Sequence, residues 1–138
     1  TSASGEQLRN HLALLPAIAA DNTIHAAKDI SMGGITGTTA MFAEACGLTI
    51  TLNRHAIRRP AGVNELDWLT CFPSFGFLLA VRPSKTKSLH QQLSGTNDLT
   101  CCSIGCFSPG AARVDLKDED TTKTLWRSYD GLTGFGCA

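Results

Sequence analysis

A short polar and glycine-rich segment, Asp29–Gly34, contains the residues of this sequence that are best suited to chemistry. A strand-like run precedes it and a helical pattern follows, so its two glycines open a helix. The first turn of a helix has unpaired backbone N–H groups and a partial positive charge. Gly33 and Gly34 would let a phosphate or carboxylate approach these groups, and Ser31 or Thr36 could add hydroxyl donors. The pattern predicts a strand-to-helix turn shaped to hold an anion.

The same spacing fits a plain helix cap, in which Asp29 or Ser31 accepts hydrogen bonds from the first turn without any ligand. Spacing alone leaves both interpretations open. The segment is not a Walker loop, because it lacks the Gly-x4-Gly-Lys-Ser/Thr pattern. The spacing of Gly33, Gly34 and Gly37 also excludes a dinucleotide-binding fingerprint.

A second turn, Ser74–Gly76, offers a hydroxyl and a glycine just before an apolar run. It fits either a ligand contact or a bend at the start of a strand. Cys71 lies nearby, but no histidine has the spacing of a nucleophile–base pair, so we expect an inert thiol. The six cysteines and four histidines lack zinc-site spacing, so no metal site is predicted.

Composition narrows the classes of function. The chain has 138 residues, of which 43% are hydrophobic and 17% charged, and its twelve basic and twelve acidic residues cancel. We therefore expect no nucleic-acid or membrane partner. Cys46, Cys102 and Cys106 occupy positions typical of small apolar residues, which predicts reduced, buried thiols in a cytoplasmic protein. Two charged groups are interpreted as solvated loop ends. They are Arg54 with Arg58 and Arg59, and Asp118–Asp120.

The elements that must position the two turns follow from periodicity and turn residues. Helices are expected over residues 7–20, 35–46 and 63–69 and from 83 to near 95, and strands over 24–27, 48–52, 77–81, 99–107, 112–116 and 122–126. Ser4 should cap the first helix, Pro16 should bend or split it, and Gly47 should end the second. The apolar run 77–81 predicts a central strand covered on both faces. The order indicates one α+β domain over 1–138, with a mixed sheet of about five or six strands and packed helices.

The motifs, in this order, resemble the C-terminal domain of the aminoimidazole ribonucleotide (AIR) synthetase superfamily. Three matches carry the resemblance: Asp29–Ile35 opening a helix that contains Ala43–Leu48, then Phe72–Pro83, and more weakly Ile104-Gly105. They cover nearly the whole chain. Members include selenophosphate synthetase, thiamine monophosphate kinase, formylglycinamide ribonucleotide amidotransferase and a hydrogenase maturation protein. Trp68–Phe77 and Leu132–Phe135 resemble a group of synthetase-like proteins of unassigned substrate, some associated with nitrilase gene clusters.

The resemblance implies the substrate- and phosphate-binding half of an ATP-dependent synthetase- or kinase-like enzyme. Such enzymes, transferases or ligases, use ATP with magnesium, have two domains and form dimers. The N-terminal ATP-binding domain, which supplies the acidic metal ligands, is missing from this chain, so we expect the chain alone to be inactive. Its partners would be that domain, a second copy in the full-length protein and a small-molecule substrate. The resemblance assigns no catalytic and no metal-binding residue here. The ligand-binding candidates are Asp29, Ser31, Gly33, Gly34, Thr36, Ser74 and Gly76.

One departure from the family pattern limits what the turn can do. Met32 stands where the thiamine monophosphate kinase branch usually has a second aspartate, and a thioether does not ligate magnesium. Asp29 is then the carboxylate of the turn, either binding a ligand or bracing the backbone. A different class of function stays open, namely a non-catalytic binding or regulatory domain that keeps the fold. Aromatic residues near the second turn are expected in the core or at the contact with the missing domain. They are Trp68, Phe72, Phe75 and Phe77.

Overall fold

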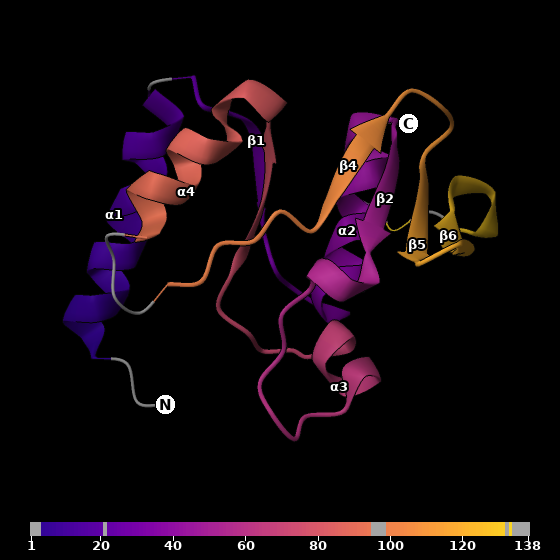
Figure 1. The fold of residues 1–138 in the computed structure, drawn as a ribbon, viewed down its shortest axis with the longest axis horizontal. Coiled ribbons are helices and arrows are strands. Elements are labelled where there is room, and N and C mark those ends of the chain that lie inside the picture. The colour runs from indigo at the N-terminus through magenta and orange to yellow at the C-terminus, as the bar shows by residue number, and fades with distance from the viewer. Residues whose placement is uncertain (1–3, 21, 95–98, 132, 134–138) are drawn as a thin grey trace. The chain divides into compact units, whose positions relative to one another are not determined.

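The computed structural model describes residues 4–20, 22–94, 99–131 and 133. The chain divides into two compact units, and Figure 1 draws the elements of both. The first unit combines Thr1–Ala27 with Leu79–Cys101, and the second combines Lys28–Leu78 with Cys102–Ala138. Among the described residues, no helix is both long and apolar enough to cross a membrane.

The first unit is built around two helices that lie side by side, α1 (Gly5–Ala20) and α4 (Thr86–Ser94) (Figure 1). Ser4 caps α1 as predicted: its Oγ accepts from the Gln7 amide at 3.2 Å, and its own amide donates to Gln7 Oε1 at 2.7 Å. A one-turn helix η2 (Pro83–Lys85) leads into α4, and Gly95, where this helix was expected to end, lies outside the described residues.

Of the two outcomes expected at Pro16, a bend or a split, the split does not occur, because α1 runs unbroken through that residue. Proline removes one helical hydrogen bond, but apolar packing holds the helix on both sides of it. The core of this unit is formed by Ile18, Leu89 and Leu93. Partly buried residues pack around these three: Leu14, Ile24, Leu79, Val81, Leu99 and Cys101.

Strands β1 (Ile24–Asp29) and β3 (Phe77–Val81) form a two-stranded sheet. The expectation that 77–81 is a central strand covered on both faces is wrong for the described residues. There, β3 pairs with β1 alone, and each of its residues is only partly buried. A continuous apolar run indicates that both faces avoid water, but it does not reveal how many strands flank it.

The second unit contains a four-stranded mixed sheet in the order β4-β2-β5-β6. Strand β2 (Thr49–Asn53) runs parallel to β5 (Arg113–Asp118) and antiparallel to β4 (Gly105–Ser108). Strand β6 (Thr121–Arg127) returns antiparallel along β5, and the one-turn helix η3 (Ser128–Asp130) follows it. The α+β class and the mixed sheet are confirmed, although the six described strands divide between two sheets.

Helix α2 (Gly34–Cys46) packs on this sheet and supplies much of its core (Figure 1). The ring of Phe42 meets that of Phe107 edge-on, with centroids 5.2 Å apart. Gly47 ends the helix as predicted, with φ 64° and its amide turned back to the carbonyls of residues 43 and 44. The buried apolar residues on α2 and the sheet are Ala40, Met41, Phe42, Ala43, Ile50, Leu52 and Val114.

The predicted strand over 99–107 is shorter in the structure, where β4 begins only at Gly105. The expectation of buried thiols is wrong for Cys46 and Cys106, which are exposed, whereas Cys102 is half-buried. Cys46 is the last residue of α2 and Cys106 lies on an edge strand, and among the described residues no second element buries either thiol.

Candidate functional site

The predicted strand-to-helix turn is present between β1 and α2. Gly33 and Gly34 both adopt left-handed backbone conformations, with φ of 79° and 61°. The Gly34 amide donates to the Ser31 carbonyl at 2.9 Å, and the Ser31 amide donates to Thr38 Oγ1 at 2.9 Å. These bonds fold the turn back onto the helix that it opens.

The residue at the cap position of α2 is Gly33, so no side chain caps the first turn of the helix. The plain-cap interpretation, with Asp29 or Ser31 as the cap, is therefore wrong. Asp29 ends β1, is exposed, and its carboxylate forms no hydrogen bond with any described residue. A bracing role for Asp29 is thus not seen in the structure. The start of α2 keeps the partial positive charge and uncapped N–H groups that favour an anion.

A short helix explains why a glycine occupies position 34. Helix α3 (Glu65–Thr70) ends directly against Gly34: a Cβ there would lie 2.5 Å from the Thr70 carbonyl carbon and 2.6 Å from the Leu69 oxygen. Thr36 reinforces this contact, because the single proton of its Oγ1 is shared between the Leu69 carbonyl at 3.3 Å and the Gly33 carbonyl at 3.2 Å. The close approach that the glycine permits is therefore made by the protein backbone.

The second predicted turn lies beside the first. The Ile30 amide donates to the Gly76 carbonyl at 2.9 Å, and a Cβ on Gly76 would lie 2.9 Å from Ile30 Cδ1. The Ser74 hydroxyl is buried and has no hydrogen-bond partner among the described residues. The structure thus gathers the candidate residues of both turns into one region of the second unit.

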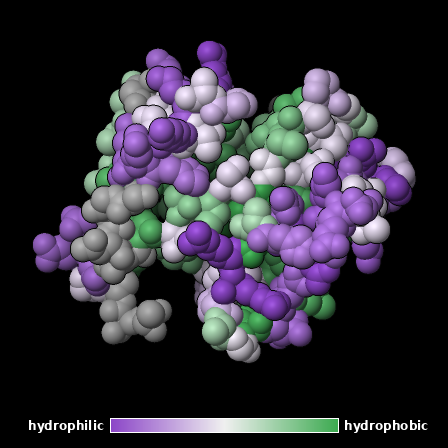
Figure 2. All heavy atoms as spheres, in the orientation of Figure 1, coloured by the Kyte–Doolittle hydropathy of each residue, from purple (hydrophilic) through white to green (hydrophobic). Residues whose placement is uncertain are grey.

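Large apolar side chains are exposed around these turns. The exposed fractions are 73% for Met32, 54% for Phe72 and 51% for Phe75, whose ring also meets Phe77 edge-on at 5.8 Å. Leu66 on α3 is 68% exposed, and Figure 2 shows hydrophobic surface mixed with polar residues in the region of this helix. Exposed apolar groups that cluster in this way are typical of a contact surface.

A second polar cluster was missed by sequence reasoning, which placed Arg54 and Asp118 among solvated loop ends. Arg54 follows β2 in the one-turn helix η1 (Arg54–Ala56), and Asp118 ends β5, so both lie at the carboxyl ends of parallel strands. Arg54 Nε and Nη2 donate to both carboxylate oxygens of Glu65 at 2.8 and 2.5 Å, and its Nη1 donates to Asp118. His55 Nε2 lies 2.7 Å from the other oxygen of Asp118.

These contacts shift the ionisation of the cluster. The Arg54 guanidinium holds the pKa of the Glu65 carboxyl below its usual range. Hydrogen bonds from Arg54 and then His55 lower the pKa of Asp118, and the two carboxylates raise the pKa of Arg54. No sequence motif marks this cluster, because its members are up to 64 positions apart and meet only when β2 pairs with β5.

Comparisons with known proteins agree with this fold. A family model described as "AIR synthase related protein, C-terminal domain" matches residues 2–126. An uncharacterized protein of Synechocystis sp. is 38% identical over 136 residues, and the match spans 98% of this chain but 42% of that relative. The solved structure of T. maritima PurL complexed with ATP is similar with a TM-score of 0.65 and 10% identity, over 78% of this chain and 18% of that one.

Proposed function

The chain belongs to the family of AIR synthase related C-terminal domains, and on that premise we propose a function for it. It is the substrate- and phosphate-binding half of an ATP-dependent synthetase- or kinase-like enzyme. The observation that carries the proposal is the uncapped start of α2 at Gly33. Asp29, whose carboxylate is exposed, ends the strand that leads into this turn. Helix starts of this kind bind phosphate groups through backbone N–H groups and the helix dipole.

The exposed apolar residues around the turns support the proposal that a partner covers them. Met32, Phe72 and Phe75 border the same turns that would hold the ligand. The chain spans 42% of the length of its Synechocystis relative, so a protein of that size has ample further chain to bury this surface. We propose that a second domain docks here and completes the site from the opposite side, and that the full-length protein forms a homodimer.

The described residues of the turn do not by themselves fit a magnesium site. Magnesium requires several oxygen ligands in near-octahedral geometry, and the turn offers the single carboxylate of Asp29 next to the thioether of Met32. Phosphoryl transfer depends on such positioned cations. We therefore expect the metal ligands to come from elsewhere in the full-length protein, and this chain to bind and orient an anionic group without transferring it.

One observation favours a second candidate, a non-catalytic domain that keeps the fold without the chemistry. Gly34 and Gly76 are each explained by a close internal approach, to the end of α3 and to Ile30, so neither needs a ligand to account for it. The two candidates differ over whether the exposed Asp29 carboxylate and the uncapped start of α2 meet a ligand.

One measurement tests the proposed division of labour, and a second separates the two candidates. The chain alone should hydrolyse no ATP above background, whereas turnover by the isolated chain would contradict the proposed division of labour. In the full-length protein, Asp29→Asn should change the affinity for ATP or substrate, and Asp130→Asn, which removes an equally exposed carboxylate from η3, should not. Equal affinity in both variants and the parent would favour the non-catalytic domain.

A further inference from the structure

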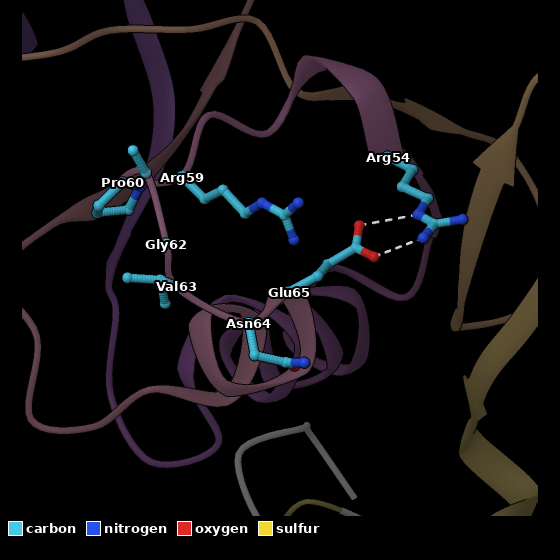
Figure 3. Close-up of a pocket in the computed structure, with 8 residues that line it drawn as sticks. Arg54, Arg59, Pro60, Gly62, Val63, Asn64 and Glu65 are labelled. Carbon is cyan, nitrogen blue, oxygen red and sulfur yellow. Dashed lines mark hydrogen bonds and ion pairs between the residues drawn. The ribbon is translucent and has the colours of Figure 1, made fainter.

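A hollow on the second unit lies apart from the glycine-rich turn and has no role in the function proposed above. It measures about 690 Å3 and is open to solvent rather than enclosed. Figure 3 shows that the Arg59 side chain extends into it toward the paired side chains of Arg54 and Glu65. The loop Pro60–Asn64 forms the rest of its lining.

The charges that line the hollow favour an anion. Arg54 and Arg59 contribute two positive charges and Glu65 one negative charge, while Asp118, which pairs with Arg54 from outside this lining, offsets the charge of Arg54 and leaves that of Arg59. Glu65 is held by two hydrogen bonds from Arg54, whereas Arg59 forms no ion pair with any residue that the structure describes. Arg59 is therefore the cation whose guanidinium donors are available to a ligand.

A neighbouring hollow of about 550 Å3 shares Arg54, Arg59 and Glu65 but is less suited to an anion. Asp118 and Glu119 also line it, so three carboxylates there face two arginines and the net charge is −1 with His55 neutral. An anion is thus directed to the side of Arg59 that faces the loop 60–64.

The loop that presents Arg59 is held on both sides of this residue. Trp68 Nε1 donates to the Arg58 carbonyl at 2.9 Å, and the Val63 amide donates to the Pro60 carbonyl at 3.4 Å. Asn64 Oδ1 then caps α3 by accepting from the Leu66 amide at 2.9 Å. A loop that is ordered before binding lowers the entropy cost of holding a ligand.

We propose that this hollow binds a small oxyanion, either a carboxylate or a phosphate group, through the guanidinium of Arg59. The planar fork of an arginine donates two parallel hydrogen bonds to either kind of group. Arg54, whose guanidinium is held by the carboxylates of Glu65 and Asp118, forms part of the wall and leaves Arg59 as the ligand-binding cation. The site is distinct from the start of α2, because none of the turn residues lines the hollow.

The test is a titration of the isotopically labelled chain with inorganic phosphate and, separately, with succinate, at constant ionic strength. The amide signals of Arg59 and of residues 61–65 should shift in at least one titration, and which anion binds more tightly identifies the chemical source. Arg59→Gln should weaken that binding by about tenfold or more, the usual loss of a charge-assisted hydrogen bond.

Arg58→Gln is the matched control, because it removes the same charge from the neighbouring position but Arg58 lines neither hollow. Its backbone carbonyl, which holds Trp68, is unaffected by the substitution. We expect this variant to bind like the parent. Equal weakening in both variants, or no shift at Arg59 and residues 61–65 with either anion, would overturn the proposal. Unchanged signals across the sheet in Arg59→Gln establish that the variant is folded.

Discussion

The glycine-rich turn and the arginine cluster present two opposite ways of building a polar site in one unit. The turn lies within a single segment, Asp29–Gly34, and the types and spacing of its residues are enough to suggest a function. The cluster brings together Arg54, Glu65 and Asp118 from three separate segments. The structure assigns much of the turn to internal packing and gives the cluster an organised set of ion pairs, whereas Arg59 forms no ion pair with a described residue. The role of residues that are close in sequence can therefore be assigned only when their contacts with other segments are known.

Replacing Gly34 with alanine should have the largest effect. The new Cβ would lie 2.5 Å from the backbone of α3, and the residue would keep a φ of 61°. Overpacking and left-handed strain together should lower the free energy of unfolding by about 3 kcal/mol, measured by urea denaturation.

Gly62→Ala is its matched control, because Gly62 also has a left-handed φ, of 79°, but a Cβ there meets nothing within 4 Å. Strain alone should cost about 1 kcal/mol. Similar losses in the two variants would show that α3 does not press against the turn.

Thr36→Val tests the same contact between the turn and α3, with a smaller expected loss of stability. The substitution removes the hydroxyl that links the turn to the Leu69 carbonyl while keeping a similar shape. We expect a loss of about 1 kcal/mol in the free energy of unfolding. Thr36→Ser retains the hydroxyl and should restore most of this stability. If serine fails to do so, the hydrogen bond is not the link.

The stability contributed by the ion pairs of Arg54 should depend on pH. We expect this effect to be smaller than those of Gly34→Ala and Thr36→Val. The carboxyls of Glu65 and Asp118 have pKa values below those of the unfolded chain, so their stabilisation is present above about pH 4. It is lost as the pH falls through the lowered values. Glu65→Gln should therefore reduce the loss of stability on acidification, measured as the urea midpoint.

Asp67→Asn provides the comparison for the acid series. Asp67 lies on the same helix as Glu65 but forms no ion pair with any described residue. Its substitution should leave the acid dependence close to that of the parent. High salt should shrink the difference between parent and Glu65→Gln, because these side chains are partly exposed and screened.

Much of the fold could be predicted from local patterns. The Ser4 cap, the Gly47 end of α2 and the strands on either side of the second helix depend on residues a few positions apart. The same applies to the turn at Gly33, whose conformation is dictated by neighbouring residues. Local chemistry therefore sufficed to find the first candidate site.

Features that depend on distant partners escaped prediction. The contact between Gly34 and the end of α3 joins residues about 35 positions apart, so the glycine was interpreted as room for a ligand. The pairing of β2 with β5 places Arg54 beside Asp118, and no local pattern encodes that pairing. The apolar run of β3 likewise does not indicate that it has one neighbouring strand among the described residues.

The central claim is that the start of α2 still binds an anion although α3 covers Gly34. The most direct measurement is the change in the amide signals of residues 31–37 when phosphate or ATP is added to the full-length protein. The account predicts selective shifts at Ile35 and Thr36, which follow the uncapped Gly33 in the first turn of α2. Unchanged signals there under saturating ligand would contradict it and leave the turn a purely structural joint between β1, α2 and α3.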